Sequence, residues 1–307
     1  MSPVEMRVPD AVKMVQGMRL LGIHAVLSAR EGRVEEALEQ CGDGMRFLEL
    51  QLPSPSLISY LVGTACVKHL AACQRAIVSG ADLEEAGLRD VIDRFDPEPW
   101  REGLSAAMGG ERILGLDVAL AMAQGRNHKT LGLSAGDRVL AWLFKPVLKA
   151  ETVFMLGIHD RMQDLSRRLY FQVMDEEGEF IEPFPEAPRL YRISGFLLPG
   201  LEAVFLKRAS LAAIFDTIRL GAACRIHRIR HGEWPESLGR LVPDILEDLP
   251  LDPFTGDPYV YRRGGRGFIV YSLGSNRRDD GGRETWVITQ MVMPEDDDWS
   301  WREGGIR

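Results

Sequence analysis

The last quarter of the chain constrains the fold most, because there a long helical pattern gives way to short strand and turn patterns. An apolar stripe with helical spacing predicts a long helix over 201–231, and Gly232 follows it as the expected C-terminal cap. Two runs rich in β-branched and aromatic residues, 259–263 and 268–271, then flank a glycine-rich connection. This arrangement predicts a β-hairpin. Because a lone hairpin is barely stable in water, we expect it to pack on the long helix before it.

Residues 11–231 are predicted to be mostly helical and to form antiparallel pairs of helices. We expect Gly32 to end the first helix, so that it forms a pair with the second. We expect Asp82 to cap the fourth helix and Gly109-Gly110 to kink or break the fifth. Pro146 is expected to separate the last two helices of this part. The expected helices cover about 12–29, 34–48, 56–78, 83–95, 100–124, 135–146 and 149–174, the fifth of them preceded by Pro97 and Pro99.

The acidic, proline-rich segment 175–200 is predicted to be an extended loop or linker. The fold class is therefore α+β, with an all-α helical array over 1–174 and a long helix packed on a small antiparallel sheet over 201–307. A third strand is expected at 285–292. Trp299 and Trp301 are either docking residues near the end of the chain or a contact for a partner.

Charge and cysteine spacing disfavour several classes of function. The 307-residue chain carries a net charge of −8, which disfavours nucleic-acid binding because phosphates require a basic surface. The basic run 225–230 is interpreted as a solvated face at a helix end. The four cysteines form no CxxC pair, and Cys66 and Cys73 would lie about 10 Å apart on one helix, too far for a disulfide. We interpret all four as buried free thiols.

No membrane or targeting segment is expected from the sequence. The first ten residues lack the continuous apolar stretch of a signal peptide. The longer apolar segments, 12–29 and 196–223, are interrupted by charged residues, which argues against a transmembrane helix.

Catalytic patterns are weak throughout the chain. It contains neither a GxSxG nucleophile motif nor a P-loop, and no dinucleotide-binding fingerprint. His227 and His231 lie four residues apart and would share a helix face as metal ligands, but no third ligand is evident nearby. His159 and Asp160, with Glu151 upstream, are interpreted as a surface pair on a helix rather than as an acid–base pair. We therefore expect no enzymatic activity.

Several short motifs follow the predicted long helix. They are His-Gly-Glu-Trp-Pro at 231–235, Leu-Pro-Leu-Asp-Pro-Phe-Thr-Gly-Asp-Pro-Tyr at 249–259, Tyr-Ser-Leu-Gly-Ser-Asn at 271–276 and Asp-Asp-Gly-Gly at 279–282. In this order they resemble the C-terminal domain of the type II secretion major pseudopilin, over about residues 205–290. The resemblance implies a long helix packed on a small antiparallel sheet, an extracytoplasmic location, and a calcium-binding loop after the hairpin. It implies calcium ligands among the Leu273 carbonyl, Asn276, Asp279 and Asp280.

The residues of this loop also support calcium on chemical grounds. Ca²⁺ takes about six to eight oxygen ligands in a flexible geometry, and Asn276, Asp279 and Asp280 lie close together among flanking glycines. Arg277 and Arg278 would repel a cation unless they point outward. The alternative is a turn rich in Asn, Asp and Gly that holds no ion. The acidic run at 295–298 is either a further source of ligands or a solvated tail.

The leading interpretation is a non-enzymatic structural or interaction protein of the cell envelope or of a secretion apparatus, with a protein partner and a calcium-stabilised C-terminal module. Pseudopilins begin with a basic leader and an apolar helix, and this chain begins with neither. We therefore expect either reuse of the module behind a helical domain or an anchor upstream. The alternatives are a soluble α-helical adaptor that binds a partner protein or peptide, and an enzyme of unrecognised type.

Overall fold

The computed structural model describes residues 11–52, 56–124, 145–175, 179–186, 188–189, 191, 201–265, 267–282 and 299–303. Its α-helices are α1 (Ala11–Arg30), α2 (Val34–Glu49), α3 (Leu57–Gly80), α4 (Glu85–Arg94), α5 (Glu98–Gln124), α7 (Lys145–Leu165) and α9 (Leu201–His231). Short 3₁₀ turns are η2 (Tyr170–Gln172) and η4 (Leu238–Leu241), and the strands are β1 (Val260–Gly264), β2 (Gly267–Ser272) and β3 (Trp299–Glu303). The described residues are mostly helical and include one small antiparallel sheet, which confirms the predicted α+β fold.

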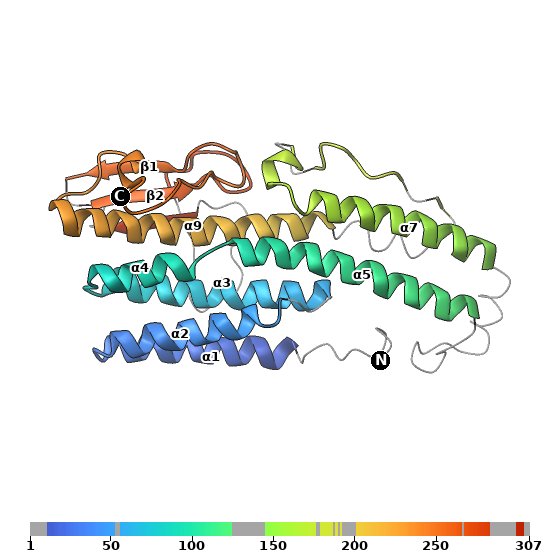
Figure 1. Cartoon of the computed structure of the whole chain (residues 1–307), viewed down its shortest axis with the longest axis horizontal. Coiled ribbons are helices and arrows are strands. Elements are labelled where there is room, and N and C mark those ends of the chain that lie inside the picture. The colour runs from blue at the N-terminus through green and yellow to red at the C-terminus, as the bar shows by residue number, and fades with distance from the viewer. Residues whose placement is uncertain are drawn as a thin grey trace.

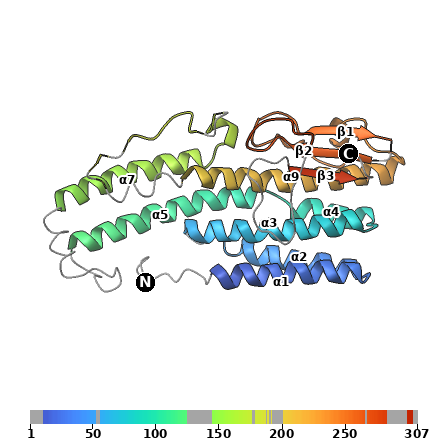
Figure 2. The same ribbon diagram turned by 180° about the vertical axis from the view of Figure 1, so that it is seen from behind.

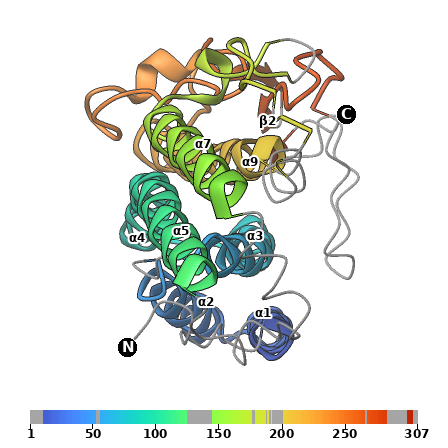
Figure 3. The same ribbon diagram turned by 90° about the vertical axis from the view of Figure 1, so that its right-hand side faces the viewer.

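The helices run along the long axis of the molecule in stacked layers (Figure 1). α1 and α2 form an outer layer, α3 contacts both of them, and α9 contacts α3 and α4 as well as the sheet. α5 and α7 pair with each other and extend beyond the other helices at one end, as Figure 2 shows from the opposite side. The view along the long axis places the sheet and the α1–α2 layer on opposite sides of the molecule (Figure 3).

The first helical pair is predicted correctly. Gly32 lies in the turn between α1 and α2 with a φ of +88°, a left-handed conformation that glycine adopts without steric cost. The buried residues of α2 include Ala37, Leu38, Cys41, Met45 and Leu48, which form the apolar stripe that its spacing predicted. α1 differs, because the residues it buries are the small Gly22, Ala25 and Ser28.

Two boundary predictions in the helical part are wrong. α4 begins at Glu85, and Glu84 rather than Asp82 occupies its N-cap position, without a side-chain cap. α5 continues through Gly109 and Gly110, so of the predicted kink or break the break is absent, and the kink stays a prediction. Glycine costs a helix only about 1 kcal/mol relative to alanine, and the packing of α5 on α3 and α7 outweighs that cost.

The helix around Pro146 also differs from the prediction. α7 runs from Lys145 to Leu165 and includes Pro146 in its first turn, where the missing N–H of proline has no intrahelical partner to lose. The helix ends before the expected position at Met174, and just beyond its end Arg208 of α9 donates to the backbone carbonyls of Ser166 and Arg168. These bonds satisfy carbonyls that a longer helix would use itself. The expected helix over 135–146 lies largely outside the described residues.

The described part of the predicted linker lies against the helices. Phe180 packs edge-on against Phe184 and against Phe205 of α9, with ring centroids 4.9 Å and 5.5 Å apart. Arg161 of α7 donates to the backbone carbonyl of Pro183 at 3.1 Å. The described residues of this segment are therefore held to α7 and α9, and an extended linker over 175–200 stays a prediction. The domain boundaries at 174 and 201 stay a prediction.

The sheet is antiparallel with strand order β1-β2-β3, and it packs on α9. The hairpin register pairs Val260 with Tyr271 and Gly264 with Gly267, which confirms the predicted hairpin. β3 supplies the third described strand and pairs Trp301 with Val270 of β2. The strand expected at 285–292 lies outside the described residues.

A continuous hydrophobic core joins the helices to the sheet. α9 contributes to both sides, since Phe215 packs edge-on against Phe95 at 5.0 Å between ring centroids, while Trp301 of the sheet is 1% exposed. Trp301 is therefore a docking residue, the first of the two alternatives. Within the described ranges, no helix has an apolar stretch long enough to cross a bilayer.

Candidate functional site

The loop after the hairpin, residues 273–282, forms a compact turn. Gly274, Arg277, Gly281 and Gly282 all have positive φ angles, between 52° and 75°. Gly282 also lies against β2, where a Cβ would stand 2.4 Å from Cδ1 of Ile269. Glycine is therefore required at 282 both by backbone conformation and by space.

Asp279, one of the predicted ligands, is turned toward the sheet. Its Oδ1 accepts hydrogen bonds from the Tyr271 hydroxyl at 2.8 Å and from the Gly281 amide at 3.0 Å. Its Oδ2 accepts from Arg262 of β1 at 2.6 Å. The hydrogen bond from Tyr271, helped by the Gly281 amide and by Arg262, lowers the pKa of this carboxyl. Asp279 therefore ties the loop to both strands of the hairpin.

Asn276 and Asp280, two further predicted ligands, lie together on the exposed side of the loop. The amide Nδ2 of Asn276 donates to Oδ2 of Asp280 at 2.9 Å, and Oδ1 of Asn276 accepts from the Arg278 amide at 2.9 Å. The fourth predicted ligand, Leu273, donates its N–H to Oδ2 of Asp252 at 2.8 Å. Asn276 is thus paired with Asp280, whereas the side chain of Asp279 is paired with the strands of the hairpin.

The predicted ligands offer the oxygen atoms that calcium prefers, but one of them, Asp279, is already paired with Arg262. Amide, carboxylate and carbonyl oxygens are the ligands that calcium prefers, and Arg277 is directed to the Met174 carbonyl, to which it donates at 2.8 Å. To bind calcium, Asp279 would have to break its ion pair with Arg262. Across the described ranges, no group of three or more His, Cys, Asp and Glu residues is arranged to hold a metal. The acidic run at 295–298 lies outside the described residues.

Asp252 organises the whole module, and the sequence analysis missed it. Its carboxylate is 1% exposed and accepts from the Phe254 amide at 3.0 Å, the Ser272 hydroxyl at 2.9 Å and the Leu273 amide. Burial raises the pKa of this carboxyl, against the effect of these donors. The motif at 249–259 enters the prediction only through the resemblance, although an aspartate between apolar residues also signals a buried acceptor.

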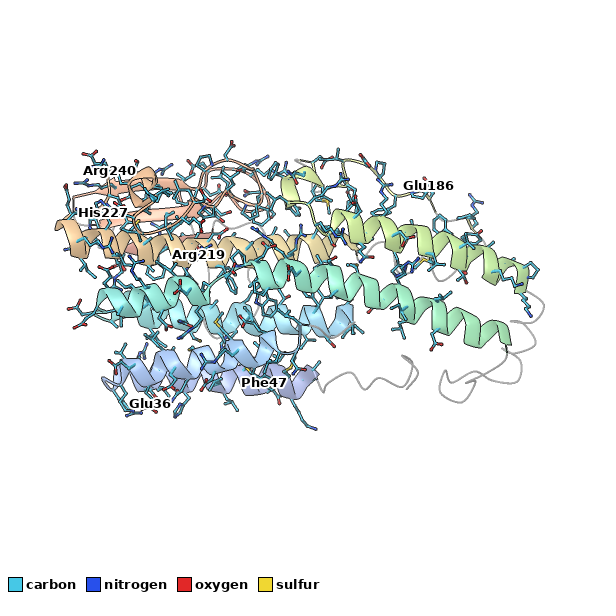
Figure 4. All side chains as sticks on the ribbon, in the orientation of Figure 1. Glu36, Phe47, Glu186, Arg219, His227 and Arg240 are labelled. Atoms are coloured by element: carbon cyan, nitrogen blue, oxygen red, sulfur yellow. The ribbon has the colours of Figure 1, made fainter. Side chains whose placement is uncertain are left out.

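A second buried carboxylate, Asp216 of α9, connects the long helix to the residue before β1. The Tyr259 hydroxyl donates to its Oδ2 at 3.0 Å, and Arg219 lies 3.6 Å from its Oδ1. Figure 4 shows Arg219 on α9 below the C-terminal part of the chain. Burial raises the pKa of Asp216 to about 6. The pair therefore fixes the position of the sheet along α9.

The basic run at 225–230 is a solvated face only in part, because residues 228–230 are exposed whereas residues 225–227 are buried or half-buried. Arg225 is partly buried and donates to the Ala81 carbonyl at 2.7 Å. Arg230 forms an ion pair with Glu85 at the start of α4, and Arg228 lies 4.5 Å from the centroid of the Trp234 ring. These side chains are needed to hold the end of α9 to α3, α4 and the following turn, a role that local sequence does not reveal.

The side chains considered for catalysis or metal binding are held in structural contacts. The rings of His227 and His231 lie 4.4 Å apart, and Nδ1 of His227 lies 3.0 Å from the Glu233 carbonyl. Nδ1 of His159 lies 2.7 Å from the Met155 carbonyl, while Asp160 pairs with Arg112 at 2.7 Å. His159 and Asp160 thus have different partners.

The four cysteines are free and buried, as predicted. Burial raises the pKa of Cys41 to about 12 and that of Cys66 and Cys73 to about 11, and it raises the pKa of Cys224 as well. A nucleophilic cysteine needs the opposite shift, since the thiolate is the reactive form. These thiols therefore fill space in the core.

No protein-family model matches this chain, and neither a curated protein nor a solved structure matches it. The resemblance to the major pseudopilin therefore depends on the motifs at 231–282 and stays a prediction.

Proposed function

We propose that the protein is a non-enzymatic structural or interaction protein of the cell envelope or of a secretion apparatus, with a pseudopilin-like C-terminal module over 201–307. The observation that carries the proposal is the arrangement of α9, the antiparallel sheet and the 273–282 loop. A long helix covered by a small sheet, followed by a loop of Asn, Asp and Gly, is the arrangement that the resemblance implies.

An exposed apolar row on α1 supports a protein partner. Val12, Leu20, Ile23 and Leu27 are between 44% and 69% exposed, and their spacing places them along one side of the helix. α1 contains no acidic residue, whereas it carries Lys13, Arg19 and Arg30. An apolar surface flanked by cations is complementary to a partner's amphipathic helix whose apolar face is flanked by acidic residues. This row also favours the second candidate function, a helical adaptor that binds such a partner.

Acidic substitutions in this exposed row are expected to prevent binding of the partner protein. We predict that the double substitution Leu20→Glu and Leu27→Glu abolishes cross-linking of the protein to its partner in its own cells, because it places two acids where acidic flanks would lie. Val153→Glu is the matched control, since Val153 is 69% exposed on α7. Mass spectrometry of the cross-linked species identifies the partner, and subcellular fractionation locates it. A partner in the envelope supports the proposal, a partner in the cytoplasm favours the adaptor, and unchanged cross-linking contradicts both.

Calcium is expected to stabilise the module through the 273–282 loop. We predict that millimolar calcium raises the melting temperature of the full chain relative to chelator, because a ligand that binds only the folded state stabilises it. The double substitution Asn276→Ala and Asp280→Ala should remove the shift, since these two side chains lie together at the exposed side of the loop. Arg262→Gln should enlarge it by freeing Asp279 for the ion.

Asp257→Ala is the matched control for the calcium measurement, because this exposed aspartate lies outside the loop. Equal melting temperatures of the wild-type protein with calcium and with chelator would remove the ion from the proposal and leave the interaction function standing.

A further inference from the structure

A cavity of about 630 Å³ lies where α5, α7 and α9 meet the turn that contains Pro253. Its walls come from the first turns of α5, the end of α7 with the residues that follow it, and the N-terminal third of α9. Known binding sites for small organic molecules have volumes of about 300–1,000 Å³. The cavity is therefore large enough for a ligand bigger than an inorganic ion.

Small residues keep this space open. Ser105, Ala106, Ser166, Ala209 and Ala212 line it. None of these side chains is long enough to cross the gap, so the three helices meet without filling it. A void left by imperfect packing would be apolar and dry, whereas six of the ten other residues that line this cavity are charged.

Four arginines reach the cavity, namely Arg101, Arg167, Arg168 and Arg208. The carboxylates in its lining are Glu98 and Glu102, so the side chains that line the cavity carry a net charge of +2. The whole chain, in contrast, carries −8. The cavity therefore concentrates positive charge on an acidic protein.

Arg208 forms the buried end of this cluster, with only 6% of its surface exposed. Burial lowers its pKa to about 10, and the charge of Arg101 acts in the same direction. The guanidinium groups of Arg208 and Arg101 therefore repel each other, and the carboxylate of Glu98 offsets part of that repulsion. An anion placed between them would relieve their repulsion.

The dipole of α7 explains only part of the cluster. Cations suit the C-terminus of a helix, which accounts for Arg167 and Arg168, and Arg208 donates to the carbonyls there. Arg101 lies in the first turns of α5, where the dipole disfavours a cation. Its partner Glu98, at 3.1 Å, is exposed and engages one of its terminal nitrogens. The remaining N–H groups of Arg101 are sufficient to bind an oxyanion.

We propose that this cavity binds a small organic molecule through a phosphate or carboxylate group. Arg101 and Arg167 bind the oxyanion from opposite walls, and Arg208 supplies positive charge from the buried end. Arginine forms paired, charge-assisted hydrogen bonds to both kinds of group. The ligand would contact α5, α7 and α9 together, beside the turn that anchors the C-terminal module, so its binding would stabilise their packing.

Isothermal titration of the full chain with inorganic phosphate and with citrate tests the proposal, with ionic strength held constant by sodium chloride. We expect saturable binding of at least one probe at a single site. Arg101→Gln and Arg167→Gln should each weaken that binding about tenfold, the loss of one charge-assisted contact. Arg240→Gln is the matched control, because Arg240 is exposed on η4 away from the cavity (Figure 4).

Each outcome of the titration bears on the proposal. Binding of phosphate alone, or of citrate alone, would support it and identify the group that the cavity prefers. Lack of saturable binding by both probes would overturn it. It would also be overturned by equal affinity of the wild type and the two cavity variants, or by an equal loss in Arg240→Gln, because each would place the ions elsewhere.

Discussion

Gly221→Ala is expected to destabilise the protein by about 3 kcal/mol, although alanine is the better helix former. Gly221 lies in the interior of α9 on the side that faces β3, and a Cβ built there would stand 2.3 Å from Cδ2 of Trp301. The indole cannot move aside, because Trp301 is 1% exposed and its strand is paired with β2. The substitution therefore forces the sheet away from the long helix.

Gly157→Ala supplies the matched comparison for this prediction. Gly157 lies within α7, is exposed, and has no atom within 4 Å of a Cβ position. There the same change should stabilise the protein by up to about 1 kcal/mol through helix propensity alone. Urea denaturation of both variants measures the two free energies of unfolding.

A second-site change separates the steric effect from other causes. In the Gly221→Ala background, Trp301→Leu should cost less than it does in the wild-type protein, because the smaller side chain makes room for the methyl group. If Gly221→Ala and Gly157→Ala changed stability in the same direction, the close approach of β3 to α9 would be wrong.

The elements that the sequence predicted well depend on local physics. The bounds of α2, α3 and α9 agree with their apolar periodicity, and the hairpin follows from two strand-forming runs around glycines. Gly32 and Gly232 have the positive φ angles that their positions at helix ends require. Each of these features is specified within a few residues.

The features that the sequence did not predict depend on contacts between distant residues. Periodicity identifies the apolar side of α1, but it does not say what covers that side, and much of it is exposed. Just beyond the end of α7, a backbone carbonyl accepts from Arg208, some forty residues later in the chain. Arg225 reaches a carbonyl of the α3 terminus.

The candidate site shows the same limit. Sequence proximity grouped Asn276, Asp279 and Asp280 as ligands. In the fold Asn276 and Asp280 pair with each other, while Asp279 pairs with Arg262. Arg262 lies on β1, so this pairing exists only after the hairpin has formed. The charge and the spacing of these residues follow from the sequence, whereas the register of the paired strands decides which side chain each of them contacts.

Asp252→Ala is expected to cost about 3–5 kcal/mol, since it leaves three donors without their acceptor. The amides of Phe254 and Leu273 and the hydroxyl of Ser272 all donate to this one carboxylate. Ser272 is completely buried, so water cannot replace the lost acceptor without opening the module. The loss should appear as a lower free energy of unfolding in urea and as faster hydrogen exchange at the Leu273 amide.

The position of Asp252 makes this prediction informative about function as well as stability. Its carboxylate joins the turn at 252–257 to the residue at which the 273–282 loop begins, so its loss should release the loop before the helices unfold. Asp257→Ala removes an exposed aspartate of the same turn and should change stability by less than about 0.5 kcal/mol. Any calcium-dependent rise in melting temperature should disappear in Asp252→Ala and persist in Asp257→Ala. Persistence of the rise in both variants would mean that the ion binds without the loop geometry that Asp252 maintains.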